Sequence, residues 1–269
     1  MNPKNARIAA IQMISTPRVA ENLAAAGALI AEAAGRGADL IALPEYFSIM
    51  GRGDADKFAT SERDGAGPIQ EFLADAAGKH GVWLVGGSLP MTAGVPGKVL
   101  NTCLVFDPRG ERVARYDKIH LFRFHKGEEC YDEGATIEPG RRPVSFAAPF
   151  GRVGLSICYD LRFPELFRAL GAIDLLVLPA AFTEVTGRAH WEILLRARAI
   201  ENQCYVLASA QGGVHENRRE THGDSMLIDP WGEVIARRDK GAGVVIGELD
   251  HARLAEVRES LPALGHRVL

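Results

Sequence analysis

The stretch RVGLSICYDLRFPELFRALGAIDLLVLPAA, residues 152–181, decides the fold class. It opens with a short apolar run that ends at Cys158 and closes with a second apolar run, 174–181. The segment between them, 163–171, has the amphipathic pattern of a helix, with Pro164 near its start. The order strand, helix, strand is typical of a layered α/β protein.

The same alternation continues on both sides of this stretch. Amphipathic runs at 18–38, 67–81 and 187–203 predict helices, and each is followed by an apolar run that predicts a strand. Hairpins are predicted around Pro108 and Pro230, and hairpins indicate mixed sheets. The predicted strands are 7–15, 39–45, 82–90, 100–108, 112–118, 143–150, 152–158, 174–181, 204–210, 223–230, 231–241 and 243–250.

Residues 119–140 are predicted to form a polar loop, and no linker or low-complexity segment interrupts the chain. Many strands with few long helices suggest two stacked mixed sheets with the helices outside. We therefore predict one α/β domain, residues 1–269.

Two twelve-residue segments of the chain are similar to each other. DPRGERVARYDK (107–118) and DPWGEVIARRDK (229–240) agree at eight of twelve positions and lie 122 residues apart. Asp-Pro-x-Gly is a turn signal, because proline fixes the entry and glycine tolerates positive φ. The similarity predicts two related hairpins in a pseudo-symmetric fold, and it places Lys118 and Lys240 at equivalent positions.

Composition limits the classes of function. The chain is 47% apolar and 24% charged with a formal net charge of −3, so neither nucleic acid nor a membrane is expected as a partner. No apolar run is long enough to span a membrane, and the first residues lack the pattern of a signal peptide. No cysteine belongs to a C-x-x-C pair, and we expect a cytoplasmic protein with free thiols. The cysteines are Cys103, Cys130, Cys158 and Cys204.

Cys158 is a candidate nucleophile because it stands between a predicted strand and a predicted helix. Such a turn exposes its side chain, and the free backbone N–H groups there can lower the pKa of a thiol or hold an oxyanion. The alternative is a buried structural cysteine, and this stretch alone does not decide between the two.

Glu45 and Lys118 are candidate partners for that thiol. Glu45 follows LIALP at the carboxyl end of a predicted strand, and a carboxylate in that apolar setting can act as a general base. Lys118 ends the first hairpin and can place a positive charge beside a thiolate or an oxyanion. The alternatives are a solvated glutamate, a surface lysine, and a base drawn from the eight histidines, none of which is singled out by its spacing.

Three motifs considered together identify a family. LPE (43–45), KIHLF (118–122) and ICYDLRFPEL (157–166) occur in an order and at spacings that resemble the nitrilase superfamily, the carbon–nitrogen hydrolases. The resemblance covers nearly the whole chain. It implies a four-layer αββα sandwich and hydrolysis of an amide through a thioester, without a metal or organic cofactor.

The resemblance also implies which residues act. The Glu–Lys–Cys triad of the family falls on Glu45, Lys118 and Cys158, and the backbone N–H of Tyr159 is expected to help hold the oxyanion. Lys240 is then expected to be inert. A further catalytic glutamate is implied in the loop after the lysine, where Glu133 is favoured over its two rivals, Glu128 and Glu129.

The residues after the cysteine favour an amide substrate. True nitrilases usually have Trp-Glu there, whereas this chain has Tyr159 and Asp160. Several segments resemble the Nit1 branch, which hydrolyses deaminated glutathione, and the Nit2 branch of ω-amidases is the alternative. Both substrates are γ-amides of a 2-oxo acid and carry a carboxylate.

A substrate carboxylate needs a cation, and Arg162 is the favoured one, since carboxylate-binding relatives have an arginine at the same offset from the cysteine. The alternative is an arginine bound to Glu165 or to a backbone carbonyl. Tyr159, Thr183 and His190 are further expected substrate-binding residues.

The helix predicted over 187–203 carries Arg196, Arg198 and Glu201 among apolar residues. Those charges predict a half-buried helix with ion pairs. Because helices of this region commonly form the subunit interface in the family, we expect a homodimer or a larger homo-oligomer, with the C-terminal segment 259–269 near a partner subunit.

Overall fold

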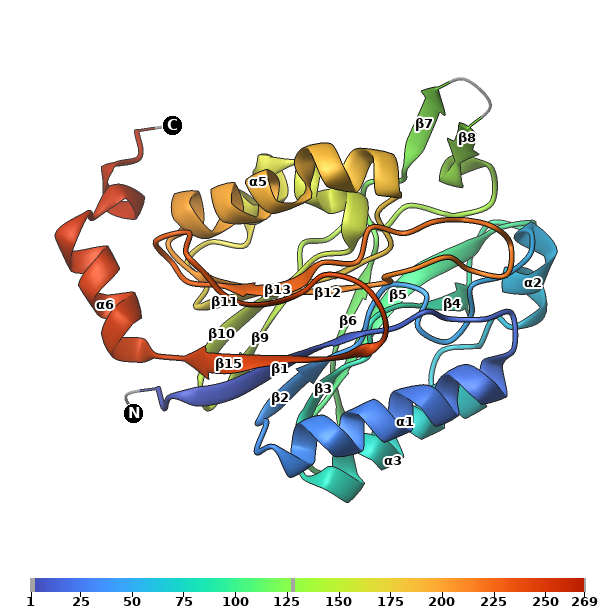
Figure 1. Cartoon of the computed structure of the whole chain (residues 1–269), viewed down its shortest axis with the longest axis horizontal. Helices are drawn as coiled ribbons and strands as arrows, with labels where there is room; N and C mark the ends of the chain where they lie inside the picture. Colours follow the sequence, from blue (N-terminus) through green and yellow to red (C-terminus); the bar gives the residue numbers. More distant parts are fainter. Residues whose placement is uncertain (1–2, 127–128, 269) are drawn as a thin grey trace.

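The protein consists of two β-sheets that lie face to face, with helices over the outer face of each (Figure 1). The structure is a computed structural model and describes residues 3–126 and 129–268. The first sheet has the strand order β15-β1-β2-β3-β5-β4, with β6 paired to β5. Its strands are β1 Ala6–Gln12, β2 Leu40–Ala42, β3 Trp83–Val85, β4 Leu89–Thr92, β5 Val99–Phe106, β6 Arg112–Asp117 and β15 Gly243–Leu249.

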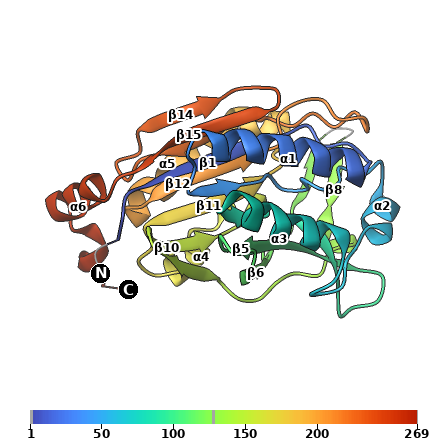
Figure 2. The ribbon, with the colours of Figure 1, turned by 90° about the horizontal axis from the view of Figure 1, so that it is seen from below.

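The second sheet has the strand order β14-β13-β12-β11-β10-β9. Its strands are β9 Ser145–Ala148, β10 Gly151–Leu155, β11 Leu175–Ala180, β12 Tyr205–Ala210, β13 Ser225–Ile228 and β14 Val234–Arg238. The α-helices are α1 Val19–Gly35, α2 Asp54–Ala59, α3 Pro68–His80, α4 Pro164–Ala169, α5 Glu184–Asn202 and α6 His251–Ser260. In Figure 2, α1 and α3 lie side by side across the outer face of the first sheet.

Strand β1 shows why the fold has four layers. Ile8 and Ala10 point into the core between the two sheets, whereas Ala9 and Ile11 pack against α1 and α3. All four side chains are fully buried, so the strand is apolar on both faces. The second sheet is covered in the same way by α4 and α5, and the predicted αββα sandwich with two mixed sheets is confirmed.

Parallel strands lie at the centre of each sheet. β1, β2 and β3 are parallel neighbours in the first sheet, and β10, β11 and β12 are parallel neighbours in the second. Glu45 follows β2, and Cys158 follows β10. Carboxyl ends of parallel strands are where open α/β sheets build their sites, so the topology gives both residues a functional position.

Three sequence predictions need correction. The predicted strand 82–90 is two strands, β3 and β4, separated at Gly86–Ser88. Gly87 has a φ of 53°, and a Cβ there would lie 2.1 Å from the carbonyl oxygen of Pro44, so the backbones approach too closely for any other residue. The helices α2 and α6 were not predicted, because both are short and weakly patterned.

The third correction concerns residues 119–140, which are not simply a loop. They contain the hairpin of β7 (Arg123–Lys126) and β8 (Glu129–Asp132), followed by the 3-10 helix η1 (Glu133–Ala135). The hairpin projects from one end of the sandwich (Figure 1). Its short, mostly polar strands lack the apolar run on which strand prediction depends.

Candidate active site

Cys158 lies at a sharp turn between β10 and α4. The strand ends at Leu155, three residues earlier than predicted, and Cys158 opens the 3-10 helix η2 (Cys158–Arg162) with a φ of 51°. A left-handed backbone is uncommon for a residue with a Cβ, and such residues are concentrated at functional sites. The predicted strand-to-helix turn is therefore present, although the strand itself is shorter.

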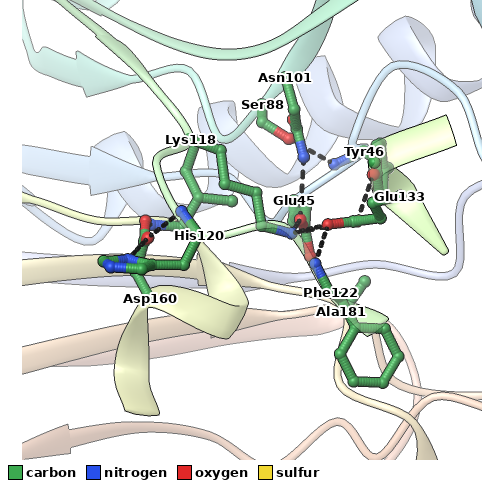
Figure 3. A network of polar contacts seen from close by, with 12 residues as sticks. Glu45, Tyr46, Ser88, Asn101, Lys118, His120, Phe122, Glu133, Asp160 and Ala181 are labelled. Carbon is green, nitrogen blue, oxygen red and sulfur yellow. Dashed lines mark hydrogen bonds and ion pairs between the residues drawn. The ribbon is translucent and has the colours of Figure 1, made fainter. Parts of the chain in front are cut away.

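Asp160 fixes this turn. Its carboxylate is fully buried. One oxygen, Oδ2, accepts hydrogen bonds from the backbone N–H of Ile157 at 2.8 Å and from the Tyr116 hydroxyl at 2.6 Å. The other, Oδ1, accepts from the backbone N–H of His120 at 3.0 Å and lies 2.7 Å from its ring Nδ1. Tyr116 and His120 flank Lys118 in the chain, so Asp160 ties the cysteine turn to the segment that carries the lysine (Figure 3).

Helix α5 supports the same turn from behind. Arg198 is 5% exposed, and its Nε and Nη2 donate to the carbonyl of Leu161 at 2.9 and 2.8 Å. Its Nη1 donates to Glu201 at 2.6 Å, and this contact is an ion pair of the kind that the sequence predicts for this helix. These charge-assisted hydrogen bonds fasten the turn to the helix.

Glu45 is held by contacts from both sheets. It is 1% exposed. Its backbone carbonyl accepts from Nε2 of Gln211, which follows β12, at 3.0 Å. Its carboxylate Oε1 accepts from Nδ2 of Asn101 at 3.0 Å and from Nζ of Lys118 at 2.8 Å (Figure 3). The carboxylate is therefore fixed from two directions before any substrate arrives.

Lys118 connects two carboxylates. Its side chain is fully buried, and besides the contact to Glu45 its Nζ lies 2.8 Å from Oε2 and 3.1 Å from Oε1 of Glu133 (Figure 3). Burial opposes the charged form of the lysine, but the charges of Glu133 and Glu45 together outweigh it and raise the pKa of Lys118 well above its usual range. The Lys118 side chain is therefore an ammonium ion in the resting site.

Glu133 completes the cluster from η1. Its Oε2 accepts from the backbone N–H of Phe122 at 2.7 Å, and its Oε1 accepts from the hydroxyl of Tyr46 at 2.9 Å. Burial raises the pKa of Glu133, but the charge and hydrogen bonds of Lys118 outweigh burial and lower it overall. Of the rival glutamates, Glu128 and the side chain of Glu129 lie outside the described residues.

The sulfur of Cys158 faces this cluster. It is within hydrogen-bonding reach of the Glu45 carboxylate and of the backbone N–H of Ala181. Burial, and then the negative charge of Glu45, raise the pKa of Cys158 well above that of a free thiol, although Lys118 acts in the opposite direction. The sequence suggested a lowered pKa; instead the resting group is a thiol, which needs a base at the moment of reaction.

Two other cysteines serve as an internal contrast. Cys103 and Cys204 are fully buried in the core, and burial raises the pKa of Cys204 to about 12. Neither lines the pocket in front of Cys158. They fit the structural alternative that the sequence left open for each cysteine.

The space in front of Cys158 is small. About 280 Å³ of this reaction pocket, part of it open to solvent, is free of atoms, but only about 10 Å³ can hold the centre of a water molecule. Its walls include most of the predicted site residues: Glu45, Glu133, Cys158, Tyr159, Arg162 and Thr183. Lys118 reaches the same place through its contacts to both glutamates.

His190 is placed differently from the prediction. It is not among the described residues that line the reaction pocket, and its Nδ1 lies 3.3 Å from Nη1 of Arg162. Arg162 also packs over the rings of Tyr159 and Phe182, at 5.7 and 5.3 Å from their centroids. Thr183 lines the pocket and also caps α5, accepting from the backbone N–H of Thr186.

Several residues of the site were missed from the sequence. Asn101 and Tyr46 bind the two glutamates, and Arg219 lines the pocket from a loop after β12. Asn101 lies near the start of a predicted strand, and Tyr46 follows LPE. Their neighbours therefore gave only a weak indication that these two residues belong to the site. Arg219 lies in the polar stretch HENRRETHG (215–223), which gave none.

Comparisons with known proteins agree with this geometry. The family model described as carbon-nitrogen hydrolase matches residues 7–259. A deaminated glutathione amidase of Synechocystis is 44% identical over 97% of this chain and 97% of its own length. The omega-amidase NIT2 of Danio rerio is 39% identical over 97% of this chain and 94% of its own length.

A solved structure shows the same fold with a reactive cysteine. It is an amidase mutant from Nesterenkonia sp. AN1 with a TM-score of 0.80 and 27% identity, covering 96% of this chain and 98% of that one. Its active-site cysteine has undergone Michael addition of acrylamide. The chain belongs to the carbon–nitrogen hydrolase family, within the nitrilase superfamily, and it is an amidase-type enzyme of that family.

No helix within residues 3–126 and 129–268 is long and apolar enough to cross a membrane. Within the same residues, no three His, Cys, Asp or Glu side chains are grouped so that they would hold a metal ion.

Proposed function

We propose that the protein is a thiol amidase in which Cys158 is the nucleophile, Glu45 the general base and acid, and Lys118 the cation that stabilises the oxyanion. The observation that carries this proposal is the contact of one buried ammonium with two carboxylates, one of which also meets the thiol. Glu133 holds the ammonium in place and keeps its charge.

In the first half of the reaction, Glu45 takes the thiol proton as the sulfur of Cys158 attacks the amide carbon. The negative oxygen that forms is stabilised by Lys118 and by the backbone N–H of Tyr159. The Nζ of Lys118 contacts three carboxylate oxygens, and in this mechanism the oxyanion replaces the longest of those contacts, 3.1 Å to Oε1 of Glu133. Glu45 then gives its proton to the leaving amine, the C–N bond breaks, and a thioester remains.

In the second half, water attacks the thioester carbon and gives a proton to Glu45. The C–S bond breaks, the carboxylic acid leaves, and Glu45 returns the proton to the sulfur. One amide and one water become one acid and one amine, with the enzyme unchanged.

We propose deaminated glutathione as the substrate, with 2-oxoglutaramate-type acids as the second candidate. The 44% identical relative supports the first and the 39% identical relative supports the second. Arg162 supports either, because it lines the reaction pocket and offers a guanidinium to the carboxylate that both substrates carry. In this account His190 does not touch the substrate and orients Arg162.

Product assays on the purified enzyme test the substrate. The account predicts release of Cys-Gly from deaminated glutathione with a kcat/KM at least tenfold above that for ammonia release from 2-oxoglutaramate. Cys158→Ala abolishes both, whereas Cys204→Ala retains both. Faster ammonia release would favour the ω-amidase candidate, and activity in Cys158→Ala would contradict the proposed nucleophile.

We further propose that the 269 residues form one catalytic domain that assembles as a homodimer in the cytoplasm. Ile193 and Ile200 are 70% and 49% exposed on one face of α5, and Trp231, beside that face, is 51% exposed. Large exposed apolar side chains that lie together indicate a protein interface. Light scattering should give a dimer for the wild type and a monomer for Ile193→Glu. A monomeric wild type at micromolar concentration would contradict the proposal.

A further inference from the structure

A second, larger hollow adjoins the reaction pocket. This outer hollow has a volume of about 530 Å³ and shares Phe122, Glu133 and Arg219 with the reaction pocket as lining residues. Its volume lies within the usual range for small-molecule sites. The reaction pocket is narrow, so a substrate with a bulky leaving group must place part of that group in the outer hollow.

The outer hollow is on the side of the general acid. Its walls include Glu133 and Asn101, which donates to the Glu45 carboxylate at 3.0 Å. Arg162 lines only the reaction pocket. Glu45 must protonate the leaving nitrogen, so that nitrogen lies toward Glu45, and what it carries extends past Glu133 into the outer hollow.

Most of the described charged residues that line the outer hollow are basic. Arg52, Lys57, Arg218 and Arg219 line it, against two acidic residues, Asp132 and Glu133. The charge of Glu133 is partly offset by Lys118, which it shares with Glu45. A leaving group with a negative charge would therefore be favoured here over a neutral one.

Of the described basic residues that line the outer hollow, Arg219 is the one that also lines the reaction pocket. Its Nη2 donates to the carbonyl of Ala181 at 2.7 Å, the residue whose N–H reaches the sulfur of Cys158. Its guanidinium also lies over the ring of Tyr131, 5.4 Å from the centroid. Among the described residues, its Nε is buried without a hydrogen-bond partner, so the protein does not use all of the donors of this guanidinium.

We propose that the outer hollow is the leaving-group subsite and that Arg219 binds a carboxylate on the leaving amine, while Arg162 binds the carboxylate of the acyl part. This assignment rests on the proposed function and adds to it a specificity for amides whose amine product is itself an anion-bearing peptide. An ammonia-releasing substrate has no group for this subsite.

Equilibrium binding tests the subsite separately from catalysis. In the Cys158→Ala background, calorimetry compares the 2-oxoglutaryl amide of Cys-Gly with the same amide ending in a carboxamide. We expect the carboxylate form to bind about 10- to 100-fold more tightly, the effect of one charge-assisted hydrogen-bonded pair. Adding Arg219→Gln should remove that preference, and Arg219→Lys should retain part of it.

Two further variants decide the orientation. Arg162→Gln should weaken both ligands equally and leave the preference between them intact. Arg188→Gln, an exposed arginine paired with Glu184 outside both pockets, is the matched control and should change neither affinity.

The assignment would be overturned if Arg219→Gln weakened both ligands equally, which would make Arg219 only a support for Ala181. It would also be overturned if Arg162→Gln removed the preference, which would reverse the orientation of the substrate. The proposed function fails in a different way, if the wild type binds these amides but hydrolyses none of them.

Discussion

The two similar hairpins of the molecule have the same backbone and different chemistry. In β5–β6, the carboxylate of Asp107 accepts from the backbone N–H of the residues two and four positions later, and Asp229 does the same in β13–β14. Gly110 and Gly232 have φ values of 79° and 88°. Both hairpins have a register shift at the same place. In the first hairpin it lies between Val105 and Phe106, and in the second it lies at the equivalent step, 122 residues later.

The lysines that end these hairpins meet different surroundings. Lys118 is fully buried between Glu45 and Glu133, beside the nucleophile turn. Lys240 is 38% exposed and pairs with Glu184 at 2.5 Å. The difference shows that the twelve-residue pattern encodes the hairpin, and that the elements packed against its end decide what its lysine does.

Exchanging each lysine for methionine should show the largest difference. Lys118→Met leaves two buried carboxylates without their cation, so we expect a loss of about 3–5 kcal/mol in the free energy of unfolding and a fall of at least about 10³-fold in kcat/KM. Lys240→Met breaks an exposed pair and should cost at most about 1 kcal/mol, with kcat/KM within twofold of the wild type. Urea unfolding and steady-state kinetics measure both.

Lys118→Arg keeps a cation between the carboxylates. It therefore serves as the control that separates a loss of catalysis from a loss of folding. It should retain most of the stability but misplace the charge, with kcat/KM reduced about 100-fold. Equal activity of Lys118→Met and Lys240→Met would remove the functional distinction between the hairpins.

Substitution of the glutamates that pair with the two lysines should change kcat/KM in a similarly unequal way, but with a smaller difference. Glu133→Gln removes one charge that holds Lys118 in place, and we expect kcat/KM to fall about 100-fold. Glu184→Gln should leave kcat/KM unchanged, because Glu184 is not among the described residues that line the reaction pocket. Full activity in Glu133→Gln would limit its role to folding.

Glu184 also makes a prediction about pH. Burial raises its pKa, but hydrogen bonds from Lys240, Arg188 and His222 outweigh burial and lower the pKa of Glu184 to about 2, from 4.5 for a free glutamate. A lowered pKa in the folded state gives stability that is present above pH 4.5 and is lost as the pH falls toward 2. Melting curves of wild type and Glu184→Gln should therefore differ at pH 6 and converge only as the pH approaches 2. A constant difference in Tm across that range would contradict the assignment.

The smallest effects on stability and activity are expected from substitutions two residues before each lysine. The first hairpin has Tyr116 at this position and the second has Arg238. Tyr116→Phe removes the hydroxyl that donates to Asp160 at 2.6 Å, so the nucleophile turn should lose about 1–2 kcal/mol of stability and kcat should fall a few-fold. Arg238→Gln affects only a contact to the carbonyl of Gly241 and should change stability by at most about 0.5 kcal/mol. Equal unfolding midpoints would show that Asp160 does not need Tyr116.

These comparisons also show how much can be predicted from the sequence. The alternation of apolar and amphipathic runs predicted both sheets and the helices α1, α3 and α5, because buried strands and helices need those periods. Residues of the site that follow such elements directly, Glu45 and Cys158, could be placed at strand ends. Family resemblance was needed to distinguish Lys118 from Lys240, since turn chemistry makes the two equivalent.

The remaining parts depend on tertiary contacts that leave no local pattern. The β7–β8 hairpin is polar and projects from the sandwich, so it resembles a loop. Arg219 acquires its position from the carbonyl of Ala181, 38 residues away in the chain. The raised pKa of Cys158 follows from its burial next to Glu45, which is visible only once the two sheets are packed together.

The rate at which iodoacetamide modifies Cys158, followed by intact mass, tests the central claim most directly: a buried thiol is made reactive by Glu45 and Lys118, and not by the equivalent lysine of the second hairpin. We predict one rapid adduct in the wild type and in Lys240→Met, none in Cys158→Ala, and an adduct at least tenfold slower in Lys118→Met. Modification of wild type and Cys158→Ala at the same rate would contradict the claim.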